Sequence, residues 1–259
     1  MDTLRYGETK KSSKGPIIGL FLFFLIGGVI LYIALANEKK PVVIGSNTTD
    51  ETNSLVDVYD EPDTEVNLED ISYTVNDKKY SDKTNSKIKS NMTLPVVSIN
   101  GEELTELNKK IDEKYTGLFE DMKTQMASAE SKYTYKVTYS IYENKIGDTK
   151  IVSITIYHRT VDDATGTYAS ENIDTYNIDV KTKKEVTQSE VATQMFGTSY
   201  KTKLKNSVKD YFVSKGIIKE EDYTYAITGF ENFYVKEGKF HMIFNGEIIK
   251  NKYYDVTIN

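Results

Sequence analysis

The sequence contains no cysteine, no tryptophan and only two histidines, His158 and His241. The absence of cysteine excludes disulfides, thiolate catalysis, cysteine-type zinc sites and lipid attachment at an N-terminal cysteine. Two histidines leave little material for a histidine-based metal site, so we expect neither a metal nor a cofactor. The 20 tyrosines, in contrast, are abundant. They suit the pleated, half-buried faces of β-strands and predict a β-rich domain.

The formal net charge of −6 over 259 residues is unevenly distributed. Residues 41–71 contain nine acidic side chains and no basic one, whereas residues 72–259 contain 27 of each. Low hydrophobicity with high net charge predicts that residues 37–71 form a disordered acidic linker. This linker is either a spacer that holds the following domain off the membrane or a solvated tail without a specific role. The neutral domain argues against binding to nucleic acid, which requires a basic patch.

An uncharged stretch of 21 residues, 16–36, is long enough to cross the hydrocarbon core of a membrane as a helix. Residues 1–15 carry four basic and two acidic side chains, which favours a short cytoplasmic tail and an extracytoplasmic domain. The alternative is a signal peptide cleaved after Ala36, because Ala34 and Ala36 form an A-x-A pattern. The apolar run is longer than the usual signal-peptide core, which favours an uncleaved single-pass anchor. Both interpretations place residues 37–259 outside the cell.

Apolar periodicity predicts the elements of the remaining domain. The expected strands are 71–80, 87–99, 133–141, 152–156, 168–180, 233–235, 240–244 and 253–258. A long helix is expected from Asn100–Gly101 to about residue 128, with Glu102 and Glu103 in its first turn. Thr187 to Glu190 form a capping-box pattern that starts a short helix, and a third helix covers about 199–215. We therefore predict an α+β fold, a mainly antiparallel sheet with helices packed on it, in two halves, 72–145 and 146–259.

Three segments resemble a known family. They are Leu-Pro-Val-Val at 94–97 before the long helix, the run 152–187 with its Lys-Thr-Lys-Lys-Glu turn, and the aromatic hairpin 232–244. Over 72–259 the chain resembles the paired extracytoplasmic domains of unknown function found in the RsiV anti-sigma factor and the PdaC peptidoglycan deacetylase of Gram-positive bacteria. The family often carries a Gly-Gly-x-His loop, whereas residues 162–168 here lack it. The resemblance implies a surface-anchored module that binds a ligand near the cell wall.

No catalytic motif stands out in the sequence. His158 ends a strand, and Glu171 or Asp174 could orient it, but no nucleophile accompanies it; a histidine making one structural hydrogen bond is the favoured interpretation. Asp162 and Asp163, together with Glu171 and Asp174, could bind Ca²⁺ through oxygen. Their spacing fits no EF-hand loop, so a polar hairpin loop is favoured.

Exposed tyrosines near strand ends are the better functional signal, because tyrosine favours contacts with proteins and sugars. The candidate ligand-binding residues are Tyr142, Tyr157, His158, Asp162, Asp163 and Tyr168. His241 lies opposite Phe240 and Met242 in its strand, which predicts a solvent-facing side chain. We expect a membrane-anchored binding or sensing module without catalytic activity. Its expected ligand is a cell-wall glycan or a wall-acting protein such as lysozyme; the alternative is a cell-wall hydrolase or a deacetylase-associated enzyme.

Overall fold

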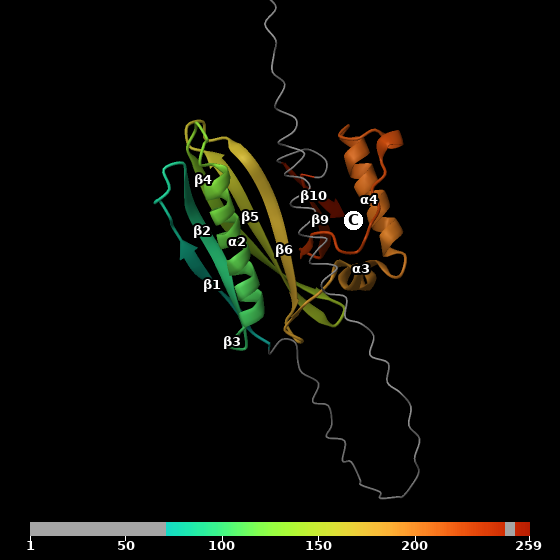
Figure 1. Cartoon of the computed structure of the whole chain (residues 1–259). Helices are drawn as coiled ribbons and strands as arrows, with labels where there is room; N and C mark the ends of the chain where they lie inside the picture. Colours follow the sequence, from blue (N-terminus) through green and yellow to red (C-terminus); the bar gives the residue numbers. More distant parts are fainter. Residues whose placement is uncertain (1–70, 247–251) are drawn as a thin grey trace, which may run out of the picture. The chain divides into compact units, whose positions relative to one another are not determined.

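The computed structural model of the chain describes residues 71–246 and 252–259. The predicted tail and membrane segment, and the linker apart from residue 71, lie outside these ranges. Within the described ranges, no helix is both long and apolar enough to cross a membrane. The fold is α+β, with mostly antiparallel strands and three helices in the described part (Figure 1).

The larger sheet, here called sheet A, has seven strands in the order β1-β2-β4-β5-β6-β7, with β3 paired to β2. Its strands are β1 (Tyr73–Tyr80), β2 (Ile88–Ile99), β3 (Glu102–Glu103), β4 (Tyr133–Ile146), β5 (Thr149–Asp162), β6 (Tyr168–Asp179) and β7 (Lys184–Glu185). Among the described strands, only β2 and β4 pair in parallel, over Ile88–Met92. Helix α2 (Thr105–Gln125) lies between them in the chain and supplies the crossover that a parallel pair requires. The predicted boundary between the halves, at 145/146, falls at the β4–β5 hairpin within this one sheet.

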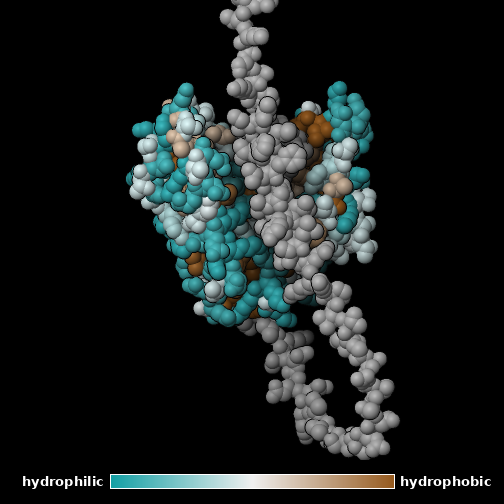
Figure 2. Space-filling model, in the orientation of Figure 1, coloured by the Kyte–Doolittle hydropathy of each residue, from teal (hydrophilic) through white to brown (hydrophobic). Residues whose placement is uncertain are grey.

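Helix α2 covers one face of sheet A, which we call the helix face. Its buried residues recur at helical spacing: Leu107, Ile111, Tyr115 and Phe119. They pack in one cluster with apolar side chains of β4, β5 and β6, such as Val137, Ile154 and Tyr176. The outward side of α2 is mainly hydrophilic (Figure 2). The expected amphipathic helix is therefore confirmed, and burial of its apolar side holds it on the sheet.

The start of α2 differs from the prediction. Asn100 and Gly101 have positive φ angles of 50° and 78°, and they form the tight turn between β2 and β3. Glu102 pairs with Ile99 in that short hairpin instead of occupying a first helical turn. The reason is that Asn-Gly favours the two-residue hairpin turn, in which both central residues have positive φ. The helix begins only at Thr105.

The second sheet, sheet B, has the order β10-β9-β8. Its strands are β8 (Phe233–Lys236), β9 (Lys239–Asn245) and β10 (Tyr253–Ile258), and its helices are α3 (Gln188–Phe196) and α4 (Tyr200–Ser214). The helices bury Leu204, Val208 and Phe212 against Phe240 and Phe244. The expectation of one sheet carrying all helices is therefore wrong: α3 and α4 form a core of their own with a separate sheet.

The unpaired edge of β8 lies against the face of sheet A opposite α2, which we call the second face. Side chains of sheet A satisfy the β8 backbone there. The Asn177 amide donates to the Phe233 carbonyl at 2.7 Å, and the Ser153 hydroxyl accepts from the Val235 N–H at 3.1 Å. The amide of Asn144 donates to the Val235 carbonyl at 2.8 Å. Because a buried backbone group without a partner is costly, these side chains fix how the two sheets join. Asn144, expected in a turn, thus lies within β4 and serves this joint.

The predicted capping box at the start of α3 is confirmed. The Thr187 hydroxyl accepts from the Glu190 N–H at 3.2 Å, and the Glu190 carboxylate accepts from the Thr187 N–H at 2.6 Å. We expect Thr187→Ala to lower the free energy of unfolding by about 1 kcal/mol, because a helix-end N–H loses its partner. Urea unfolding measures this loss. Thr202→Ala, at an exposed position of α4, is the control and should be neutral or slightly stabilising; equal effects of the two changes would contradict a capping role.

Candidate functional site

The second face of sheet A carries a row of polar side chains that continues across four strands. Asn91, Lys136, Arg159 and Glu171 are cross-strand neighbours on β2, β4, β5 and β6. Arg159 forms an ion pair with Glu171, with 2.6 Å between Nε and Oε1. Its guanidinium also lies 5.2 Å from the ring centre of Tyr168, which is 54% exposed. The candidate Tyr168 is therefore a surface aromatic supported by a charged neighbour.

Tyr142 and Tyr157, two further candidates, lie on the same face but at the joint between the sheets. Tyr142 stacks on Tyr234 of β8 with ring centres 5.4 Å apart. Both tyrosines are half-buried and pack against a small cluster that contains Ile173 of β6 and Ile243 of β9. Part of each side chain therefore contributes to packing between the sheets.

His241 is not solvent-facing, and that prediction is wrong. Its side chain is only 12% exposed, and its Nδ1 lies 2.9 Å from Oδ1 of Asp255. The ring stacks on Tyr234 at 4.5 Å, and the Tyr234 hydroxyl donates to the other Asp255 oxygen at 2.6 Å. The physical reason is that the face of β9 opposite Phe240 and Met242 packs toward sheet A instead of toward water. Burial, reinforced by Asp255, raises the pKa of the Tyr234 phenol, so this hydroxyl remains a donor.

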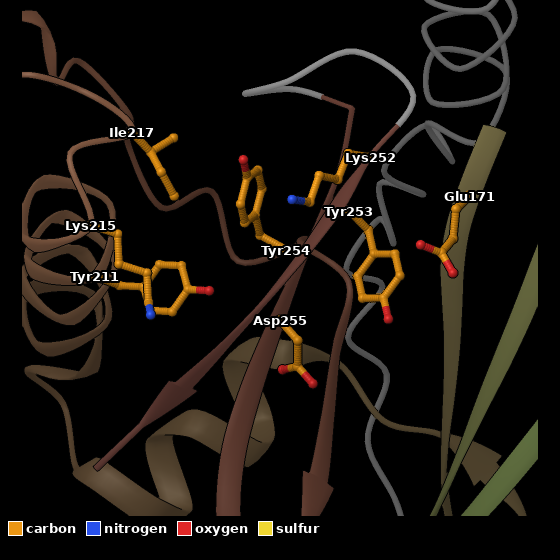
Figure 3. Close-up of a pocket in the computed structure, with 8 residues that line it drawn as sticks. All are labelled: Glu171, Tyr211, Lys215, Ile217, Lys252, Tyr253, Tyr254 and Asp255. Carbon is orange, nitrogen blue, oxygen red and sulfur yellow. The ribbon is translucent and has the colours of Figure 1, made fainter. Parts of the chain in front are cut away.

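A pocket of about 690 Å³ adjoins this cluster, along β10, which is an end strand of sheet B (Figure 3). The residues that line it are Glu171, Tyr211, Lys215, Ile217, Lys252, Tyr253, Tyr254 and Asp255. Glu171 comes from sheet A, Tyr211 projects from α4, and Lys215 directly follows that helix (Figure 3). The volume lies in the range of small-molecule sites. Three phenol rings and four charged groups give it both apolar surfaces and hydrogen-bonding partners.

Both acids of this pocket already have partners. Glu171 pairs with Arg159, and Asp255 accepts from Tyr234 and contacts His241. Each carboxylate is therefore held in place, and this arrangement suits positioning of a bound ligand. Tyr253 and Asp255 carry no signal of their own in the sequence beyond the alternation of the last strand.

His158 lies on the helix face, opposite the face that carries Tyr142, Tyr157 and Tyr168. Its Nε2 is 3.2 Å from Oδ2 of Asp174, the orienting carboxylate that the sequence offered together with Glu171. The same oxygen accepts from the Tyr115 hydroxyl at 2.8 Å and pairs with Lys114 at 2.9 Å. The side chains of His158 and Asp174 are 12% and 14% exposed. These contacts tie α2 to β5 and β6.

The charge state of Asp174 follows from opposing effects. Burial alone would raise its pKa, but the hydrogen bond to His158 and the charge of Lys114 outweigh burial and lower the pKa below its usual range. Burial and the Asp174 charge raise the pKa of Tyr115, which therefore stays protonated as a donor. The cluster is a satisfied structural network that centres on one carboxylate.

Asp162, expected in a loop, is the last residue of β5, and Asp163 begins the β5–β6 connection; both have structural partners. Asp162 accepts from the backbone N–H of Ala164 at 2.8 Å, and Asp163 pairs with Lys89 at 3.1 Å. Asp174 points toward α2, whereas Glu171 lies on the second face. These two acids therefore do not come together with Asp162 and Asp163 as a Ca²⁺ site would require. Across residues 71–246 and 252–259, no three metal-ligating side chains gather in one place.

Several solved structures are similar to this chain. No family model matches the sequence, and no curated protein matches it. The solved structures of two DUF3298 family proteins are similar, one from Pseudomonas aeruginosa with 10% identity and a TM-score of 0.43, the other from Bacteroides fragilis with 13% identity and a TM-score of 0.41. Each match covers 73% of this chain and 90% of the other. The likeness to the RsiV and PdaC domains stays a prediction.

Proposed function

We propose that the domain is a non-catalytic binding or sensing module, held outside the cell by residues 16–36, and that its ligand is a cell-wall glycan. The pocket along β10 is the observation that supports this proposal. Tyr253 is half-buried and offers aromatic surface to the C–H face of a sugar, and Lys215 and Lys252 offer donors to hydroxyl groups. Glu171 and Asp255 are both held by partners within the protein, which suits them as fixed hydrogen-bond acceptors for a ligand.

The test is a titration of the full chain in detergent micelles with soluble peptidoglycan fragments. We expect Tyr253→Ala to weaken binding about tenfold or more, because the ring lies at the centre of the proposed contact. Tyr73→Ala is the matched control, since Tyr73 is also half-buried but belongs to β1, at the edge of sheet A. Its affinity should equal that of the unmodified chain.

Two outcomes would change this proposal. If lysozyme binds and the fragments do not, the ligand is a wall-acting protein and the glycan assignment is wrong. If mass spectrometry finds the fragments cleaved or deacetylated after incubation, the non-catalytic assignment is wrong, and the hydrolase alternative takes its place.

A further inference from the structure

Two adjoining depressions lie at the end of sheet A where the β1–β2 connection, the starts of β2 and β4 and the β5–β6 connection meet. Their volumes are about 540 and 280 Å³, and both are lined by Lys83, Lys89 and Asp163. The lysines that line one or both are Lys83, Lys87, Lys89, Lys132 and Lys136. We call these two depressions together the lysine site. Five positive charges converge here around a single carboxylate.

The single carboxylate does not neutralise the lysine site. Asp163 pairs with Lys89, and the Thr134 hydrogen bond and the Lys89 charge lower its pKa, so it stays ionised. Within the described part of the chain, the other four lysines form no salt bridge. The nearby Asp82 forms an ion pair with Lys123, with 2.7 Å between Oδ2 and Nζ. Lysines therefore outnumber carboxylates in the lining of both depressions, which favours an anionic ligand.

Hydrogen bonds hold the β1–β2 connection in the shape that presents Lys83 and Lys87. The Ser90 N–H donates to the Asp82 carbonyl at 2.8 Å, and the Asp82 N–H donates back to the Ser90 hydroxyl at 2.9 Å. Asn85 accepts from the N–H of Lys87 at 2.7 Å. The backbone that carries Lys83 and Lys87 is therefore held in place by these bonds, which lowers the entropy cost of ordering this connection on binding.

We propose that the lysine site binds successive phosphate groups of a linear anionic polymer that lacks bases. Two adjoining depressions suit two phosphates of one chain, and ammonium groups are suitable point charges for them. Nucleic acid is disfavoured because single strands need aromatic platforms for stacking, and among the described residues the only aromatic ring that lines the site is the half-buried Tyr133. A lipid surface is disfavoured because the only aliphatic residue of the lining, Ile88, is buried. This proposal does not depend on the glycan pocket.

The experiment measures binding of tripolyphosphate to the full chain in zwitterionic detergent micelles by calorimetry. We expect the double change Lys83→Gln and Lys136→Gln to weaken binding about tenfold and to reduce its dependence on salt. The matched control is Lys181→Gln with Lys184→Gln, which removes the same charge from exposed lysines near the β6–β7 turn. The control should bind as the unmodified chain does, and thermal unfolding should show that both variants fold.

Three results would overturn the lysine site. The first is no binding of tripolyphosphate by the unmodified chain, and the second is an equal loss in both double variants, which would indicate only general charge attraction. The third is tighter binding of a thymidine oligonucleotide than of tripolyphosphate, which would assign the site to nucleic acid. Tyr253→Ala should leave tripolyphosphate binding intact, so a failure of this proposal is distinguishable from a failure of the glycan pocket.

Discussion

Replacing Asp174 with alanine should lower the free energy of unfolding by about 3 kcal/mol. The carboxylate binds His158, Tyr115 and Lys114 together under α2, so its loss leaves the buried Tyr115 and the mostly buried His158 without this partner. We place the loss at the low end for a buried ion pair because the Lys114 side chain is 41% exposed and can turn to water. Urea unfolding at neutral pH measures the change.

Asp121→Ala is the matched control for Asp174→Ala. Asp121 is an exposed acid on α2, and its removal should alter the free energy of unfolding by less than about 0.5 kcal/mol. If the two substitutions had equal effects, α2 would not depend on the Asp174 network for its attachment to the sheet.

The lowered pKa of Asp174 also predicts a pH dependence of stability. The folded pKa lies below the unfolded value of about 3.9, so the stabilising effect is complete above about pH 5 and declines as the pH falls through 4. Asp174→Asn removes the titrating group while it keeps the shape. The difference in unfolding free energy between the unmodified chain and Asp174→Asn should therefore shrink from about pH 6 to pH 3. A difference that stays constant over this interval would contradict an ionised Asp174 in the folded state.

Local elements could be predicted from the sequence because local patterns determine them. The alternation that starts at Tyr133 produces β4, and the spacing of Leu107, Ile111 and Tyr115 produces α2. The capping box at Thr187 marks the start of α3. Asn100 shows the limit of this reasoning: Asn-Gly before an apolar helix fits a helix start and a hairpin turn equally well, and only the pairing of β3 with β2 decides between them.

The arrangement of the two sheets could not be predicted, because it depends on contacts between residues far apart in the chain. Ser153 and Asn177 occupy ordinary polar positions of alternating strands, and nothing local indicates that they satisfy the backbone of β8. The packing of β9 toward sheet A likewise reverses the expected exposure of His241.

The lysine site could not be predicted either, because its residues are far apart in the chain. Its lysines come from the β1–β2 connection and from the regions around the starts of β2 and β4, and the domain that contains them is neutral on average. A neutral sum of charges does not describe the field over each part of the surface, because folding can gather charges of one sign in one place.

Replacing Asn177 with alanine should lower the free energy of unfolding by about 2–4 kcal/mol. Asn177 is 4% exposed, and its amide links the Ser153 hydroxyl, at 2.6 Å, to the Phe233 carbonyl. Its loss leaves that carbonyl and that hydroxyl buried without this partner. The same change should accelerate hydrogen exchange at the Val235 amide, since its acceptor Ser153 is no longer fixed.

Two further variants decide whether hydrogen bonding or packing accounts for this effect. Asn76→Ala, on the exposed side of β1, is the control and should be close to neutral. Asn177→Leu fills the volume of the lost amide but restores no hydrogen bond, so we expect it to remain as destabilised as Asn177→Ala. If leucine instead recovered the lost stability, shape alone would hold the sheets together. If both Asn177→Ala and Asn177→Leu are destabilised, position 177 requires a side chain that fills the joint and also hydrogen-bonds to the edge of β8. That requirement would explain why an asparagine occupies a strand position otherwise suited to β-branched and aromatic residues.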